Sequence, residues 1–272
     1  MNPESDLQSL LALAIRAATD AGATLHRRFL DSRSLDVQFK GEGINNLVTE
    51  MDTAAERMIR QILGERPEIT FLGEETGGDE ELSDFTWVVD PIDGTVNYAH
   101  GLPIWCVSIA LVRKNEPLVG VIYNPNLDET FTAIKGKGAF LNGTRLGVSS
   151  EANFRRALLV TGFPYNVHEN PHGTIDTFGD VLRQGNAIRR LGSAALDLAY
   201  VAAGRFEGFW EVELHPWDVA AGLLLVNEAG GTISSYAPDQ PSTPTREIVV
   251  DRLLATNGHI HQEMAHHLQR KS

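Results

Sequence analysis

The chain has 272 residues and carries 23 Lys and Arg against 36 Asp and Glu, so its formal net charge is −13. This length favours one large domain or two halves packed together. Binding to nucleic acid or to an anionic membrane needs a basic surface, so the acidic balance argues against both partners. It does not exclude a phosphorylated substrate, because bound cations reverse the field of an acidic site.

The sequence carries no pattern typical of a secreted or membrane protein. Its single cysteine, Cys106, excludes an intramolecular disulfide and lies in an apolar stretch, as a small core residue would. The first apolar stretch, Leu10–Ile15, does not resemble a signal peptide, and no run approaches the ~18 apolar residues of a membrane span. We therefore expect a cytoplasmic protein.

Two helices and then several strands are predicted in the first half. Apolar spacing predicts a helix from about Leu7 to Leu25 and a second over about Thr53–Leu63, with Asp52 at its N-cap and a loop at Lys40–Asn46 before it. Four strands follow, over Phe85–Asp90, Trp105–Val112, Leu118–Tyr123 and Glu129–Ile134. Within the glycine-rich stretch after them, Asn142-Gly143 predicts a hairpin turn.

The second half mixes short strands with helices. Strands are predicted over Ala157–Thr161, Phe206–Val212 and near Leu253–Thr256. Helices are predicted over Ile175–Gln184, Ser193–Ala203 (with Ser193 as N-cap and Gly204 at its end), Asp218–Ala229 and from about His259. These blocks lack regular strand–helix alternation and predict a layered α+β protein. The best internal boundary lies near Ser149–Asn153, and we expect halves of about 1–150 and 151–272 packed as one unit.

The segment Trp87–Thr95 carries the strongest chemical signal. A buried-looking strand runs directly into Asp-Pro-x-Asp-Gly-Thr, in which the strand end fixes Asp90 while Pro91 and Gly94 restrict and bend the backbone. This geometry directs three oxygen-bearing side chains at one small volume: Asp90, Asp93 and Thr95. A plain turn would also use Asp, Pro and Gly. Such a density of hard oxygen donors favours Mg²⁺.

Further acidic residues stand at the ends of predicted elements. Glu74 follows the apolar stretch Ile69–Leu72, and Glu211 ends a predicted strand. Asp52 and Asp218 open predicted helices, where an N-cap is the simpler interpretation. Converging carboxylates repel one another and need a compensating charge, which divalent cations supply. The combination is typical of metal-assisted phosphoryl transfer to water.

The same residues resemble the inositol monophosphatase family of Mg²⁺-dependent sugar and inositol phosphatases. Five stretches carry the resemblance, in order: Gly41–Asp52, Gly73–Glu75, Trp87–Asn97, Arg190–Ala195 and Trp217–Gly231. The resemblance implies an αβαβα sandwich fold, two or three Mg²⁺ ions, a homodimer and inhibition by lithium.

The resemblance also implies a role for each matching residue. Glu74, Asp90 and the Ile92 carbonyl would hold one metal, Asp90, Asp93 and Asp218 a second, and a third would depend on Glu74. Asp52 and Thr95, counted with Glu74 as catalytic, would position and activate the attacking water. The N–H groups of Gly94 and Thr95 would bind phosphate, and the substrate hydroxyls would contact Asp93, Gly192, Ser193, Ala194 and Glu211.

Three positions depart from the family pattern or match it only weakly. Asn46 stands where many relatives have Asp, which leaves one fewer carboxylate for a third metal. Val96 replaces a common Thr, and Lys40 matches a loop lysine of the family but also suits plain surface.

We predict hydrolysis of myo-inositol 1-phosphate or a similar small polyol phosphate. Another phosphate ester is the first alternative: fructose-1,6-bisphosphate, NADP, histidinol phosphate or adenosine 3′,5′-bisphosphate. The second alternative is a regulatory protein that binds transcription machinery and keeps the phosphatase fold. The basic group Arg183, Arg189 and Arg190 is expected at the surface or at a dimer interface.

Overall fold

The computed structural model describes residues 6–31, 37–39, 47–78, 84–237, 242–249 and 251–269, with backbone only at 37–39 and 47–49. The predicted loop Lys40–Asn46 therefore lies outside the described residues. Within the described ranges, no helix combines the length and the apolar composition needed to cross a membrane.

The first half of the chain builds a large sheet. Its strands are β3 (Thr70–Gly73), β4 (Gly77–Gly78), β5 (Phe85–Asp93), β6 (Cys106–Arg113), β7 (Glu116–Asn124), β8 (Glu129–Ile134), β9 (Gly138–Leu141) and β10 (Thr144–Arg145). They lie in the order β10-β9-β8-β7-β6-β5-β3-β4, and only β3 and β5 among these neighbours run parallel. The predicted turn Asn142-Gly143 joins β9 to β10, with positive φ at both residues.

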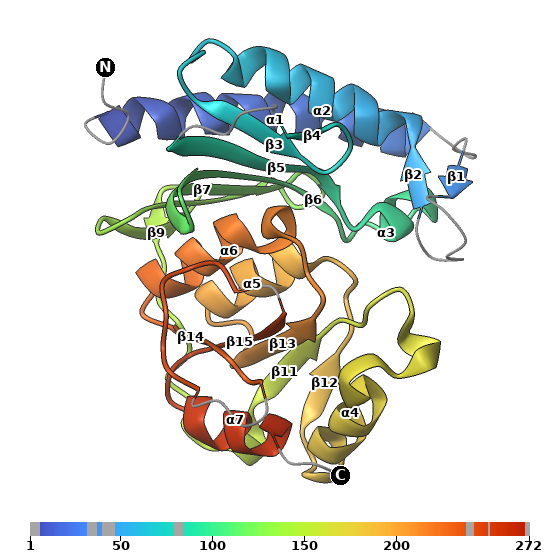
Figure 1. The fold of residues 1–272 in the computed structure, drawn as a ribbon, viewed down its shortest axis with the longest axis vertical. Coiled ribbons are helices and arrows are strands. Elements are labelled where there is room, and N and C mark those ends of the chain that lie inside the picture. The colour runs from blue at the N-terminus through green and yellow to red at the C-terminus, as the bar shows by residue number, and fades with distance from the viewer. Residues whose placement is uncertain are drawn as a thin grey trace.

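Helices α1 (Leu7–Asp31) and α2 (Glu50–Leu63) cover the outer face of this sheet (Figure 1). Their apolar stripes pack with alternate residues of β5, β6 and β7 in one core, which includes Leu10, Leu25 and Ile59. A short hairpin of β1 (Val37–Phe39) and β2 (Leu47–Thr49) lies between the two helices in the chain.

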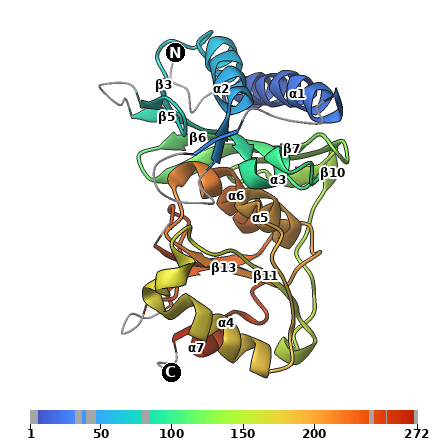
Figure 2. The same cartoon turned by 90° about the vertical axis from the view of Figure 1, so that its right-hand side faces the viewer.

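The second half builds a smaller sheet from β11 (Leu158–Thr161), β12 (Ala187–Arg189), β13 (Gly208–Val212), β14 (Thr232–Ser235) and β15 (Arg252–Thr256). Its order is β12-β11-β13-β15-β14, with β11 parallel to both of its neighbours. Helices α4 (Thr174–Arg183) and α7 (His261–Gln269) lie on its outer face (Figure 2).

Helices α5 (Ala194–Ala202) and α6 (Pro216–Glu228) form the layer between the two sheets (Figures 1 and 2). In α6 every residue from Val219 to Val226 is buried, because a helix between two sheets has no solvent-facing side. The layers therefore follow the order αβαβα, which confirms the predicted fold class. That the two halves form one domain stays a prediction.

The sequence placed most elements within a few residues but missed some. Strand β5 continues to Asp93, three residues beyond its predicted end, and is followed directly by the unpredicted short helix α3 (Thr95–Ala99). Strands β12 and β14 were also not predicted. The N-cap prediction for Asp52 is wrong, because α2 begins at Glu50 and Asp52 lies inside its first turn.

Candidate active site

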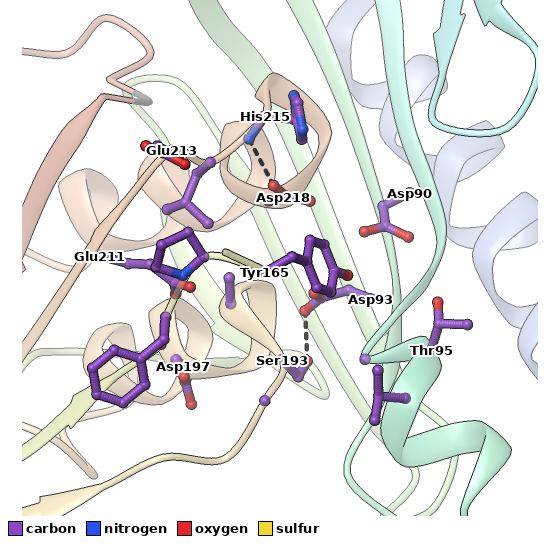
Figure 3. Close-up of a pocket in the computed structure, with 18 of the residues that line it drawn as sticks. Asp90, Asp93, Thr95, Tyr165, Ser193, Asp197, Glu211, Glu213, His215 and Asp218 are labelled. Carbon is purple, nitrogen blue, oxygen red and sulfur yellow. Dashed lines mark hydrogen bonds between the residues drawn. The ribbon is translucent and has the colours of Figure 1, made fainter. Parts of the chain in front are cut away.

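A cavity of about 590 Å³ opens where the ends of β5 and β13 meet the starts of α5 and α6 (Figure 3). Eleven of the twelve predicted site residues line it: Glu74, Asp90, Ile92, Asp93, Gly94, Thr95, Gly192, Ser193, Ala194, Glu211 and Asp218. The twelfth, Asp52, is fully buried behind Thr95. The structure thus brings together residues from positions 52 to 218.

An irregularity in β5 places Asp90 and Asp93 on the same cavity. Residues three apart in a regular strand point to opposite faces of the sheet. Here Asp90 pairs with Ser108 and Asp93 with Cys106, so β5 has one more residue than β6 in this interval. This β-bulge turns the strand end and directs both carboxylates into the same space. The Asp90 side chain then accepts the Ile92 N–H at 2.9 Å.

Asp93 is fixed by the start of α5. Its Oδ2 accepts hydrogen bonds from the Ser193 hydroxyl at 2.5 Å and from the Ala195 N–H at 2.7 Å. Ser193 occupies the predicted N-cap position, but its side chain does not cap the helix. Its hydroxyl is instead used to hold the carboxylate.

Asp218 stands in the first turn of α6, which begins two residues earlier than predicted. Its Oδ2 accepts a hydrogen bond from the His215 N–H at 2.7 Å. This is the capping-box contact, in which a side chain in the first turn binds the backbone of the N-cap residue. The His215 ring stacks on Trp217 with ring centroids 4.8 Å apart. The helix start is therefore rigidly held beside the cluster.

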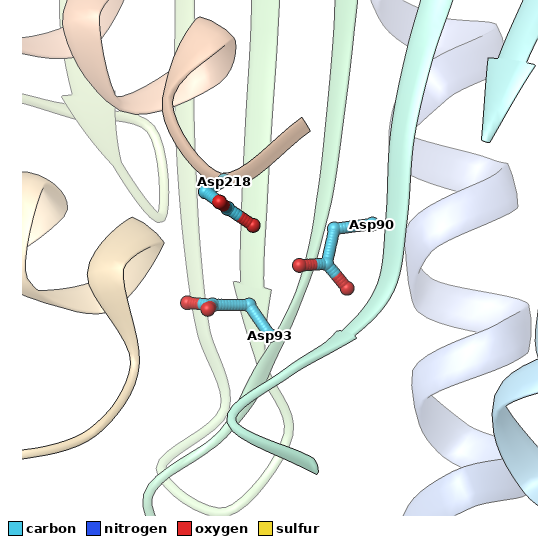
Figure 4. Close-up of side chains that lie close together, drawn as sticks. All are labelled: Asp90, Asp93 and Asp218. Carbon is cyan, nitrogen blue, oxygen red and sulfur yellow. The ribbon is translucent and has the colours of Figure 1, made fainter. Parts of the chain in front are cut away.

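Asp90, Asp93 and Asp218 form one carboxylate cluster (Figure 4). One oxygen from each lies within 4.8 Å of the others. Burial raises the pKa of Asp90 and Asp218 well above the ordinary value, and neighbouring carboxylates add to it. Burial also raises the pKa of Asp93 to about 6, although Ser193 and Ala195 oppose the shift. Hard oxygen donors brought together against their own repulsion fit a divalent cation.

A second group of contacts joins α2 to the turn after β5. The Thr95 hydroxyl lies 2.9 Å from both Asp52 Oδ1 and the Ile92 carbonyl oxygen, and donates its proton to one or the other. Gly94 makes the sharp turn with φ +100°, and a Cβ there would lie 2.9 Å from the Ile104 carbonyl. Only glycine fits this turn, which places Thr95 at the cavity wall.

Glu74, just after β3, is held in place through Glu56, a buried carboxylate that sequence reasoning missed. Glu56 lies on α2, and its two oxygens accept the N–H groups of Glu75 and Thr76 at 2.8 Å each. The segment that follows Glu74 is therefore attached to a helix on the far side of β3.

Substituting Glu56 by Ala is expected to lower the free energy of unfolding by about 3 kcal/mol, because the fully buried carboxyl group and its hydrogen bonds to the N–H groups of Glu75 and Thr76 are lost. Urea unfolding followed by circular dichroism measures the change. Glu50→Ala on the same helix is the control and should cost about 0.5 kcal/mol or less, since Glu50 is exposed and its contact with Arg28 spans 3.8 Å. A Glu56→Ala loss as small as the control would contradict this role.

The side of the cavity away from Asp90 carries Glu211, at the end of β13. Burial raises the pKa of Glu211 to about 8, against a partial opposing effect of Arg190. The carboxyl group lies so close to Gly162 that a Cβ there would come within 2.1 Å of it.

This pKa gives stability a defined pH dependence. The pKa of Glu211 is higher in the folded protein than in the unfolded protein, so the folded protein holds this proton more tightly. The resulting contribution to the free energy of unfolding is present at low pH and is lost as the pH rises from about 4.5 to about 8. In EDTA, the wild-type protein should lose on the order of 2 kcal/mol relative to Glu211→Gln over this range. Urea unfolding at pH 5 and pH 8 measures the difference. The exposed Glu169→Gln control should follow the wild type, and parallel curves for all three would contradict the assignment.

Sequence reasoning did not assign several other polar cavity residues to the site, among them Asp197, Tyr165 and Arg190. Asp197 had a usable signal, since it is the lone charged residue in an otherwise apolar predicted helix. Arg190 is exposed, as expected for the basic group, but it also borders the cavity. Nothing in the sequence marks Tyr165.

The remaining sequence expectations concern residues around the cavity. Val96 lines it, whereas Lys40 and Asn46 lie outside the described residues. Cys106 is fully buried, as predicted. In the part of the chain that the structure describes, the three aspartates form the only cluster of His, Cys, Asp or Glu side chains close enough to share a metal ion.

Comparison with known proteins matches nearly the whole chain to the family that its motifs resemble. A profile of the inositol monophosphatase family matches residues 6–272. An inositol-1-monophosphatase from Synechocystis sp. is 41% identical over 263 residues, which cover 96% of this chain and 89% of the relative. A Nus factor SuhB from Pseudomonas aeruginosa is 44% identical over 237 residues, covering 85% of this chain and 86% of the relative.

Solved structures match over the whole fold. The extragenic suppressor protein suhB from Bartonella henselae has a TM-score of 0.87 and 39% identity, covering 97% of this chain and 100% of that one. The inositol monophosphatase from Anabaena has a TM-score of 0.83 and 39% identity, covering 97% and 96% of the two chains. With this agreement in sequence and fold, the chain belongs to the inositol monophosphatase family of phosphoric monoester hydrolases.

Proposed function

We propose that this protein is a Mg²⁺-dependent phosphatase that hydrolyses inositol monophosphate, with myo-inositol 1-phosphate as its substrate. The observation that carries the proposal is the cluster of the buried Asp90 and Asp93 with the half-buried Asp218, which shares one cavity with the Thr95–Asp52 hydrogen bond. The relatives named inositol-1-monophosphatase support the substrate class.

The donor set fits two cations. Glu74, Asp90 and the Ile92 carbonyl would hold the first, and the three-aspartate cluster would hold the second. A third would depend on Glu74. When bound, Mg²⁺ supplies positive charge that neutralises the carboxylates and polarises the phosphate.

Asp52 and Thr95 position the attacking water. When Thr95 donates its proton to Asp52, its oxygen keeps lone pairs that accept a hydrogen bond from water. This contact orients the water. The Asp52 carboxylate behind the Thr95 hydroxyl favours transfer of a proton from the water through that hydroxyl. The backbone N–H groups of Gly94 and Thr95 would hold the phosphate in line with this water.

The leaving polyol would lie on the opposite side of the cavity. Gly192, Ser193 and Ala194 line this side together with Glu211. Asp93 reaches the same side through its hydrogen bonds to Ser193 and Ala195, so it links the cluster to the polyol end.

A substrate panel tests the proposal. Phosphate release by the purified protein is measured for each of the five candidate esters, with Mg²⁺ and with EDTA. Buffer without substrate serves as the blank. The expected result is the highest kcat/KM for myo-inositol 1-phosphate and loss of release in EDTA. Full activity in EDTA, or a higher kcat/KM for fructose-1,6-bisphosphate, would contradict it.

A role with transcription machinery is the second candidate function. It is supported by relatives named Nus factor SuhB, which are 40% to 44% identical to this chain. A pull-down with Asp90→Asn protein distinguishes the roles, because a partner retained without activity supports a separate binding function. A homodimer, lithium inhibition and a cytoplasmic location stay predictions from the family resemblance.

A further inference from the structure

Asp197 is a buried carboxyl group with one oxygen that has no hydrogen-bond partner among the described residues. It lies in the first turn of α5, is 1% exposed and lines the cavity. Its Oδ1 forms no hydrogen bond with any of the residues that the structure describes. Burying a polar atom without a partner is unfavourable, so such atoms in native proteins call for a specific explanation.

The neighbours of Asp197 within α5 do not supply a structural reason for an acid, although the positive charge of Arg190 at the cavity border partly favours its charged form. Its neighbours in α5 are apolar and fully buried, among them Leu196 and Leu198. An apolar residue at this position would pack without the unfavourable burial of a carboxyl group. The chain therefore keeps a residue here that lowers its stability, as expected of a group that binds a ligand.

Asp197 and Glu211 stand together on the side of the cavity away from Asp90 and Thr95 (Figure 3). Burial raises the pKa of Asp197 well above the ordinary value, with Glu211 adding to it, and raises the pKa of Glu211 to about 8. A carboxyl group accepts hydrogen bonds in either protonation state and donates one when it is protonated, which matches an alcohol.

We infer that Asp197 is a specificity-determining residue, whose carboxyl group binds hydroxyl groups of a polyol leaving group together with Glu211. The inference rests on the proposed function and narrows its substrate class. An apolar leaving group would leave the Asp197 oxygen without a hydrogen-bond partner. Monophosphates of polyols therefore fit this end of the cavity better than monophosphates of apolar alcohols.

The test compares two monophosphates that differ in hydroxyl groups. The ratio of kcat/KM for myo-inositol 1-phosphate to that for phenyl phosphate is measured with Mg²⁺ in wild type, Asp197→Leu and Asp197→Asn. In Asp197→Leu the ratio should fall about tenfold or more, while phenyl phosphate hydrolysis stays within about twofold. In Asp197→Asn it should stay within about threefold of wild type, because an amide also donates and accepts.

Thermal unfolding provides a readout independent of activity. Asp197→Leu should melt at or above the wild-type temperature, and Asp20→Leu, which changes an exposed residue of α1, should leave the ratio unchanged. If Asp197→Leu does not fold, Asp197→Ala replaces it with the same expected ratio.

An unchanged ratio, or an equal loss for both substrates, overturns the inference. The proposed function fails separately if the wild-type protein hydrolyses neither phosphate.

Discussion

Replacing Asp90 by Asn is expected to reduce Mg²⁺-dependent phosphate release by about 10³-fold or more in kcat/KM. Asp90 is the one residue assigned to both proposed cation sites. The substitution removes a negative charge at the centre of the cluster while keeping the shape of the side chain. Steady-state assays across a Mg²⁺ titration measure the effect, and saturating Mg²⁺ should not restore the wild-type rate.

The same substitution should leave the fold intact and raise the melting temperature of the metal-free protein. Burial and the nearby carboxylates Glu74 and Asp93 raise the pKa of Asp90, which means that its charged form destabilises the fold. Asp84→Asn, at the exposed position just before β5, is the matched control and should change neither quantity. Near-normal activity of Asp90→Asn, or a melting temperature far below wild type, would refute the assignment.

Thr95→Ala and Asp52→Asn are expected to lower kcat by about 10²- to 10⁴-fold with little change in KM. The two side chains share one hydrogen bond of 2.9 Å, and Asp52 lies behind the cavity wall. They act on the attacking water, not on the polyol, so ground-state binding of the substrate should survive.

A double-variant cycle tests whether the two residues act as a unit. The combined variant should be about as slow as the slower single variant, because either change alone breaks the pair. Thr53→Ala, next to Asp52 on α2, is the control and should retain wild-type kcat. Additive losses, or losses that appear in KM alone, would exclude a joint role in positioning water.

Residue pattern alone placed most of the architecture. Apolar periodicity located α1 and α2, a long apolar run ended by two glycines located α6, and turn residues separated β5 to β8, because these signals are local. Short elements such as β12 and β14 were missed. Their strands form by pairing with neighbours distant in the chain, which no local pattern records.

Helix starts were the least accurate part of the prediction near the site. Asp52 and Asp218 both look like N-caps in the sequence, yet each lies inside a first turn. Acidic residues are favourable throughout the first turn of a helix, so composition alone does not fix the starting residue. The difference matters because it turns Asp52 toward Thr95.

The sequence by itself determined which residue types are available for chemistry. Asp90, Asp93 and Thr95 lie in one short motif, and Pro91 and Gly94 within it restrict and bend the backbone. The sequence thus separates the acidic residues into a small group at motif positions and a larger group expected at the surface. These conclusions are local and needed no knowledge of the fold.

Only the tertiary structure decided how those residues meet. The bulge in β5 puts Asp90 and Asp93 on one side, and the helix layer between the sheets brings Asp218 beside them. The same layer buries Asp197 and leaves its Oδ1 without a hydrogen-bond partner among the described residues. Burial and proximity depend on contacts between distant segments, so the raised pKa values and the polyol end of the cavity arise only when the two sheets pack around α5 and α6.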